Sequence, residues 1–520
     1  MSSPAAMSSP AKKPQGLWAA LAEPQTVIVL LILYCAVHFL VRFLLSPNFT
    51  LDESEQVLFG QSLQWGYRFR HPPLITWLSW ATLDATGNSR AAFFLLKYAL
   101  MALGLVAYFA AARTILRDVR LAALASFALL TTFVMGWLPH VDLMHTVLLA
   151  TMLAAYLWAD ARTITRGTLG DYVLLGVITG LGVLSKYVFI VLPLAMAIGV
   201  ALTPRFRRRL RLGPLLLAAV VAAIIVAPYA IWAVTHEYSL FALAKTITKS
   251  AGPSFDPIGW LKGAGDLVVA LIGFGIPFIA IFPLFYWRAC WPLPAGDEDE
   301  RAWLRTLEIT MIAAALMMLA AVFFIGTEAF KPRWMHQVLM PLPIYLFLRV
   351  KLAYGAEDRA HKLFALTALA FALVAVAARI WIYETEAEHC KICREYWPMP
   401  RYADTFRRAG FVRGTIVAPS YDLAGNLRAQ FPESRVVTPG YPVSIFGPPV
   451  PGECLLVWRG EGDLPPNLRD YVTQTYGARL ENRAVQGDVE AALLTSKHRR
   501  ERMNFIILPE GACDHPRARP

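Results

Sequence analysis

The chain alternates long runs of apolar residues with short polar segments over most of its 520 residues. A membrane-spanning helix needs about 20 mostly apolar residues, and the apolar residues here are concentrated in runs of roughly that length. The pattern therefore predicts an all-α polytopic membrane domain with about eleven transmembrane helices. The predicted spans are 24–45, 91–112, 121–138, 143–159, 172–185, 187–203, 213–235, 267–287, 307–326, 335–349 and 363–383.

Basic residues orient these predicted spans. No small-residue cleavage site follows the first apolar run, so residues 1–23 should be a cytoplasmic segment that precedes an uncleaved anchor. Every loop then predicted to be cytoplasmic is rich in Arg or Lys, in agreement with the positive-inside rule. The transmembrane domain would cover 24–385, with external loops at 46–90 and 236–266, of which the second could close over a site. The net charge of +12 therefore reflects the basic cytoplasmic loops and their contact with anionic lipid, and it does not indicate nucleic-acid binding.

The composition changes at the carboxyl end, residues 386–520. Short strand-like runs bounded by Gly and Pro alternate there with helical segments, which predicts a small extracytoplasmic α/β domain. Four exported cysteines permit up to two disulfides, and one possible pairing joins Cys390 to Cys393 and Cys454 to Cys513. Half a zinc site at the first pair is the alternative, although no second pair with that spacing is present.

An acidic pair directly follows the first predicted span. A carboxylate beside a bilayer is expensive to desolvate, so we expect the chain to use Asp52 or Glu53. Neighbouring residues of a helix point about 100° apart, so at most one of the two should face a shared centre. That carboxylate could deprotonate a hydroxyl, or bind an amine or a metal. The alternative is a solvated helix cap, because acidic residues are favoured at helix starts.

The same external loop carries cations. Arg70 precedes His71, and the two prolines that follow turn the chain back into an apolar helix. The loop thus combines a carboxylate with a cationic patch that can hold phosphate. Ordinary anchoring at the membrane interface is the alternative for the arginines.

A further polar turn is predicted where the sequence reads PHVDLMH. The spacing of His140, Asp142 and His145 could ligate a divalent metal. Alternatively, Asp142 caps the apolar helix that it opens.

Two more cationic positions are predicted at the same membrane level. Lys186 interrupts an apolar stretch, and a lone buried cation there requires an anion. Lys331 and Arg333 lie in a second turn. Snorkelling anchors explain one such residue, whereas several on one face fit a lipid-linked phosphate better.

These segments resemble, in order, those of the GT-C glycosyltransferases: the acidic loop that ends in HPPL, then HVDLMH, GLGVLSKYVFIVLPL and KPRWMHQVLMPLPIYL. The most similar subgroup is the bacterial branch with the lipid A aminoarabinose transferase, rhizobial galacturonosyltransferases and protein mannosyltransferase-like enzymes. The resemblance covers about residues 25–385. It implies a multi-pass protein of the bacterial inner membrane, with its amino terminus cytoplasmic and its carboxyl-terminal domain outside.

The resemblance also implies a reaction. Such enzymes transfer a sugar from a polyprenyl phosphate to an envelope lipid, glycan or protein, and no cofactor is required here, although a divalent metal is possible. Asp52 would be the catalytic carboxylate, with Glu53 beside it, while His71 falls where some relatives have lysine. The residues expected to bind donor phosphate or acceptor are Arg70, His71, Asp142, Lys186, Lys331 and Arg333.

Two other classes of function remain open at this point. A transporter or flippase of lipid-linked sugar should carry key charges near the bilayer midplane and gates on both faces. The candidate residues cluster outside instead, and the cytoplasmic loops are short. A non-catalytic envelope assembly protein would use its carboxyl-terminal domain for binding, and Asp52 would be dispensable.

Overall fold

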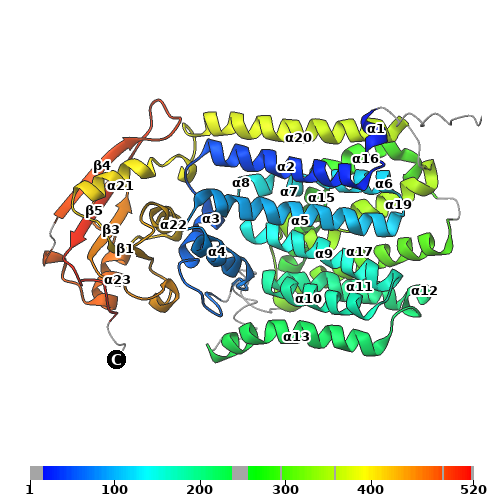
Figure 1. The fold of residues 1–520 in the computed structure, drawn as a ribbon, viewed down its shortest axis with the longest axis horizontal. Helices are drawn as coiled ribbons and strands as arrows, with labels where there is room; N and C mark the ends of the chain where they lie inside the picture. Colours follow the sequence, from blue (N-terminus) through cyan, green and yellow to red (C-terminus); the bar gives the residue numbers. More distant parts are fainter. Residues whose placement is uncertain are drawn as a thin grey trace, which may run out of the picture.

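The computed structural model consists of a long helical bundle with a smaller α/β domain at one end (Figure 1). The described residues are 16–68, 70–236, 256–292, 296–355, 359–482 and 485–516. Most of the expected cytoplasmic segment 1–23 and much of the external loop 236–266 lie outside these ranges. The all-α membrane domain with a small carboxyl-terminal α/β domain is confirmed.

Among the described residues, seven helices are long and apolar enough to cross a membrane. They are α2 (Pro24–Leu45), α5 (Arg90–Leu116), α9 (Met144–Thr165), α13 (Leu212–Thr235), α15 (Pro257–Gly275), α17 (Glu298–Ile325) and α20 (Arg359–Glu386). An eighth span would be α6 (Val119–Leu130) with the pair α7 (Phe133–Gly136) and α8 (Leu138–Val141), bent by 78°. Shorter apolar helices are α10 (Leu169–Ser185), η1 (Tyr187–Ile190) with α11 (Val191–Ala201), and α16 (Phe278–Tyr286).

Besides the bent span of α6, two predicted spans are divided at a proline. The run 267–287 is split at Pro277 between α15 and α16, and α15 begins ten residues early, inside the predicted external loop. The run 335–349 is split at Pro341 between α18 (His336–Leu339) and α19 (Leu342–Tyr354). A proline ring has no N–H to donate and clashes with the preceding turn, so the helix ends there although the apolar run continues.

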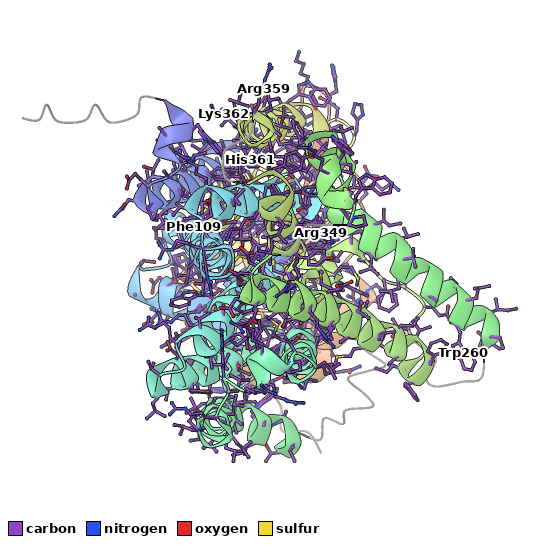
Figure 2. All side chains as sticks on the ribbon, turned by 90° about the vertical axis from the view of Figure 1, so that its right-hand side faces the viewer. Phe109, Trp260, Arg349, Arg359, His361 and Lys362 are labelled. Carbon is purple, nitrogen blue, oxygen red and sulfur yellow. A yellow bond between two sulfur atoms is a disulfide. The ribbon has the colours of Figure 1, made fainter. Side chains whose placement is uncertain are left out.

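Small residues let the helices approach closely. A Cβ atom at Gly176 or Gly180 of α10 would lie 2.5 Å from the Ala218 carbonyl oxygen or 2.8 Å from the Ile225 side chain of α13, respectively. Such contacts are typical of helix pairs in membranes, where packing rather than water exclusion drives association. At the end of the bundle away from the α/β domain lie basic residues such as Arg349 (Figure 2).

The carboxyl-terminal domain holds a five-stranded sheet in the order β2-β1-β3-β5-β4. Strand β1 is parallel to β2 and β3, whereas β5 is antiparallel to β3 and β4. The strands are β1 (Gly414–Val417), β2 (Arg435–Val437), β3 (Glu453–Arg459), β4 (Val485–Ala492) and β5 (Arg500–Leu508). The helices are α21 (Met399–Arg408), α22 (Tyr421–Gln430) and α23 (Pro466–Tyr476).

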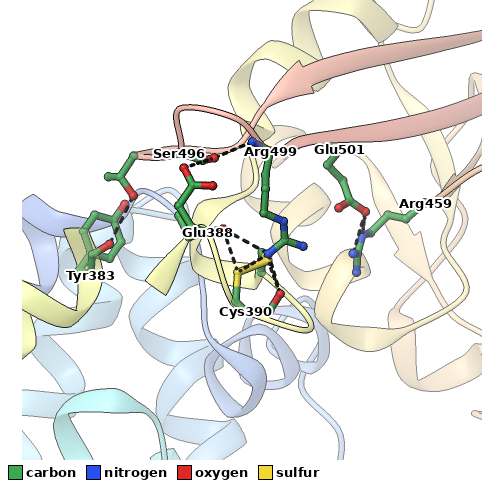
Figure 3. Close-up of a disulfide and its surroundings, with 10 residues drawn as sticks. Tyr383, Glu388, Cys390, Arg459, Ser496, Arg499 and Glu501 are labelled. Carbon is green, nitrogen blue, oxygen red and sulfur yellow. Dashed lines mark hydrogen bonds and ion pairs between the residues drawn. A yellow bond between two sulfur atoms is a disulfide. The ribbon is translucent and has the colours of Figure 1, made fainter. Parts of the chain in front are cut away.

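Two disulfides hold this domain. Cys390 is bonded to Cys393 just after α20, and Cys454 at the start of β3 is bonded to Cys513. This is one of the pairings that the sequence leaves open, and it leaves no thiolate at the first pair for zinc. The Arg499 guanidinium donates to the Cys390 carbonyl oxygen over 2.8 Å, which ties the end of the membrane domain to the turn before β5 (Figure 3).

The α/β domain rests on the external loop 46–90, which forms two helices, α3 (Leu51–Phe59) and α4 (Leu74–Ala85). Helix α22 lies against α3 (Figure 1). A Cβ atom at Gly425 would lie 2.1 Å from the Ser54 carbonyl oxygen, so only glycine permits this approach. Asn426 accepts a hydrogen bond from the Phe49 amide at 2.9 Å. The first turn of α3 is therefore held by both domains.

Candidate active site

Glu53 anchors α3 to the membrane domain. Its carboxylate pairs with Arg42 of α2 at 2.6 Å and with Lys97 of α5 at 3.1 Å, and all three side chains are buried. It also accepts a hydrogen bond from the Thr50 amide, which completes a capping box. Burial opposes ionisation, but Arg42 and Lys97 hold the pKa of Glu53 well below its usual range. Both carboxylate oxygens of Glu53 are thus engaged in positioning α3 against α2 and α5, and the catalytic role expected for Glu53 beside Asp52 stays a prediction.

Asp52 points elsewhere and is half-buried. Its carboxylate has no hydrogen bond or ion pair with any residue that the structure describes. Its amide donates to Asp142 Oδ1 at 3.1 Å, and Thr50 Oγ1 donates to the same oxygen at 2.7 Å. Asp142 thus caps the first turn of α3 rather than the helix α9 that follows it. Of the two adjacent carboxylates, Asp52 is the one left open for chemistry.

Asp142 and Asp52 lie close enough for their charges to interact. Burial and the neighbouring Asp52 carboxylate raise the pKa of Asp142 to about 8. Asp142 therefore holds a proton near neutral pH.

Three cations from three different segments interact electrostatically, since Arg70 and Arg333 both act on Lys186, as does the Asp52 carboxylate. Lys186, in the break between α10 and η1, donates to Thr146 Oγ1 at 3.2 Å. Burial lowers the pKa of Lys186 to about 8. The charge of Asp52 opposes this shift, whereas the charges of Arg333 and Arg70 add to it. In the described parts of the chain, none of the three cations forms an ion pair with a carboxylate. Cations without carboxylate partners are able to hold an anion.

The second cationic turn supplies Arg333 to this cluster. Arg333 lies in η3 (Pro332–Trp334) and acts on Lys186. Lys331 precedes η3, and its side chain is exposed.

His71 does not supply a cation. Its ring stacks on His145 with centroids 4.1 Å apart. Burial, His145 and Arg68 together hold the pKa of His71 well below its usual range, so the ring is neutral. Its Nδ1 atom is buried and has no hydrogen-bond partner among the described residues. His71 can therefore offer a hydrogen bond, but no charge, to a bound group.

Sequence reasoning missed Glu55. This buried carboxylate lies three residues after Asp52 on α3, and it forms an ion pair with Arg68. His145 Nε2 lies 3.6 Å from its second oxygen. Although burial opposes ionisation, Arg68 and His145 lower the pKa of Glu55. The spacing of Asp52 and Glu55 could have pointed to Glu55, because residues three apart share a helix face.

The three polar residues of PHVDLMH do not converge as a metal site. His140 Nε2 lies 2.7 Å from the Tyr34 hydroxyl of α2, and its ring stacks on His38. His145 faces Glu55 instead. No group of three His, Cys, Asp or Glu residues suited to a metal ion occurs within the ranges described above.

The chain is similar to known membrane glycosyltransferases. A family model described as dolichyl-phosphate-mannose-protein mannosyltransferase matches residues 70–232. The lipopolysaccharide core galacturonosyltransferase RgtA of Rhizobium johnstonii is 31% identical over 453 residues, covering 84% of this chain and 87% of that protein. The lipopolysaccharide core galacturonosyltransferase RgtB of the same organism is 29% identical over 474 residues, covering 88% of this chain and 93% of that protein.

A solved structure agrees at the level of the fold. The crystal structure of ArnT from Cupriavidus metallidurans in the apo state superposes with a TM-score of 0.59 and 14% identity, covering 92% of this chain and 97% of that one. With the sequence relatives, this shows that the chain belongs to the GT-C superfamily of membrane glycosyltransferases. The protein is a multi-span membrane enzyme that transfers sugars.

Proposed function

We propose that the enzyme transfers one monosaccharide from a polyprenyl-phosphate donor to a cell-envelope acceptor on the outer face of the bacterial inner membrane. The observation that carries the proposal is the unpartnered Asp52 carboxylate, whose charge acts on Lys186 together with the charges of Arg70 and Arg333. These three cations also lack carboxylate partners among the described residues. A base next to an anion site is what this reaction requires.

The transfer would proceed by a single displacement. Asp52 takes the proton of the acceptor hydroxyl as its oxygen attacks the anomeric carbon, and the bond from that carbon to the phosphate oxygen breaks. The leaving group is polyprenyl phosphate, which gains one negative charge. Lys186, Arg70 and Arg333 stabilise that charge, and a single displacement inverts the anomeric centre. Asp142, which holds its proton, keeps α3 in position.

The names of the relatives support a uronic acid as the sugar. Both are lipopolysaccharide core galacturonosyltransferases, at 31% and 29% identity. A uronic acid on a phosphodiester brings two negative charges, so a site with three cations and one free carboxylate suits it electrostatically. We therefore propose galacturonic acid as the sugar and the lipopolysaccharide core as the acceptor.

The test is a transfer assay with purified enzyme in lipid vesicles. Synthetic polyprenyl phosphates carrying galacturonic acid, galactose or aminoarabinose are each offered with lipopolysaccharide core, and the labelled product is isolated. We expect transfer from the galacturonic acid donor above all others. Transfer only from a neutral or amino sugar would contradict the proposed sugar. Movement of donor across the vesicle membrane without transfer would instead indicate a flippase.

A further inference from the structure

The carboxyl-terminal domain reaches the active site through two tyrosines. Tyr421 begins α22, whose Gly425 packs directly on the Ser54 backbone of α3. Tyr441 follows β2, and its ring contacts Phe59 at the other end of α3, with centroids 5.2 Å apart. Both tyrosines are half-buried, so part of each ring remains open to solvent.

Tyr441 is linked to the acidic face of α3. Arg68 Nη1 donates to the Tyr441 hydroxyl over 3.3 Å, and another nitrogen of the same guanidinium pairs with Glu55. The position of Arg68 is therefore set by the membrane domain and by the α/β domain together. Glu55 is three residues from Asp52, which places this linkage beside the proposed base.

Tyr421 lies near the acidic residues Glu55 and Asp52 of α3, and its side chain is available for a ligand. Its hydroxyl makes no hydrogen bond within the described part of the chain. Burial, Glu55 and the charge of Asp52 raise its pKa, to about 12, so the phenol remains protonated at all working pH values. A neutral phenol offers a donor, an acceptor and an apolar ring face, the combination by which tyrosine binds amphipathic groups such as sugars.

We propose that Tyr421 and Tyr441 bind the acceptor sugar and determine which acceptors the enzyme can use. This inference rests on the proposed function. The donor tail must lie in the membrane, so its phosphate reaches Lys186 and Arg333 from the bundle. The two tyrosines belong to the domain that lies outside the bundle (Figure 1). The charge of Asp52 acts on Tyr421, and Tyr441 is linked to the same helix, α3, through Arg68 and Glu55. An acceptor held between them presents its hydroxyl to Asp52.

Equilibrium binding tests this assignment without requiring turnover. The full-length enzyme in detergent is titrated with lipopolysaccharide core oligosaccharide and, separately, with undecaprenyl phosphate. We expect Tyr421→Ala to weaken oligosaccharide binding about tenfold, as for loss of one good contact. Tyr421→Phe, which keeps the ring, should lose less, and Tyr441→Phe should also weaken binding. The affinity for undecaprenyl phosphate should stay within about twofold of wild type in all three.

The matched control is Tyr471→Phe, on α23 of the same domain, which should leave both affinities unchanged. An oligosaccharide affinity that is equal in wild type and Tyr421→Ala, or that is absent from both, overturns the proposal. An equal loss of affinity for both ligands in a variant that unfolds at the wild-type temperature also overturns it, since the tyrosines would then not act on the acceptor alone. Absence of transfer by a wild type that binds oligosaccharide through Tyr421 would refute the proposed reaction alone.

Discussion

The amide of Asp52 donates a hydrogen bond to Asp142 Oδ1 over 3.1 Å, so the residue proposed as base is held by its backbone while its carboxylate stays free. These two residues come from different segments, α3 and the turn between α8 and α9. Thr50 donates to the same Asp142 oxygen. Asp142 therefore fixes where Asp52 stands relative to the cations.

Substitution of Asp142 should reduce turnover by misplacing Asp52. Asp142→Ala removes the acceptor of both hydrogen bonds, and we expect kcat to fall about 100-fold, as for a displacement near 1 Å. Asp142→Asn keeps an oxygen that can accept both bonds and should lose less. Steady-state kinetics with saturating donor measures the difference. Equal kcat in the alanine and asparagine variants would show that the hydrogen bonds are unimportant.

Donor binding should weaken as the pH rises through about 8. Burial lowers the pKa of Lys186 to that value, so the ammonium is charged below it and neutral above it. A charge-assisted hydrogen bond to the phosphate is lost on deprotonation, and the affinity for undecaprenyl phosphate should fall about tenfold. The measurement is a titration of binding against pH.

The control for that titration is Lys186→Arg, which stays charged throughout because a guanidinium is not deprotonated in proteins. Its affinity for undecaprenyl phosphate should remain constant above pH 8, where the wild type weakens. An identical alkaline decrease in both proteins would assign the titration to another group, and Asp142, whose pKa is also about 8, would then be the first candidate.

Loss of Glu53 should destabilise the protein more than loss of its neighbour. Glu53→Gln leaves Arg42 and Lys97 buried without a carboxylate, and breaking such a buried pair costs about 3–5 kcal/mol. The midpoint of thermal unfolding in detergent should therefore fall clearly. Asp52→Asn, which removes no ion pair, should leave the midpoint unchanged. Equal midpoints in the two variants would refute the positioning role of Glu53.

A methyl group at Gly425 should separate the α/β domain from α3. The Cβ atom of Gly425→Ala would lie 2.1 Å from a backbone oxygen of Ser54, which cannot move without shifting α3. We expect lower transfer activity and faster proteolysis of the carboxyl-terminal domain. Gly265→Ala on α15 is the control, because nothing lies within 4 Å of the added atom. Normal activity in Gly425→Ala would mean that the close packing is not required.

The sequence predicts the membrane fold well because lipid selects long apolar runs. It does not show breaks within such a run, and Pro277 and Pro341 divide spans that hydropathy presents as continuous. Within the acidic loop, Asp52, Glu53 and Glu55 have similar neighbours in sequence. Only the contacts of α3 with α2 and α5 separate a buried ion pair from a free carboxylate.

The sequence also could not predict which distant segments contribute side chains to the site, because that depends on contacts that form only in the folded protein. Tyr421 and Tyr441 lie in a domain that shows no signature of a catalytic site, and only the docking of this domain on α3 brings them to the acidic loop. The roles of these residues remain predictions for measurement.

The most direct test compares sugar transfer and donor binding in wild type, Asp52→Asn and Asp84→Asn. Asp84 is an exposed residue of α4 in the same external loop and serves as the matched control. If Asp52 is the base, Asp52→Asn loses transfer by at least about 100-fold, as for removal of a general base, and still binds undecaprenyl phosphate. Asp84→Asn should behave as wild type. Transfer by Asp52→Asn at the wild-type rate would contradict the proposed active site.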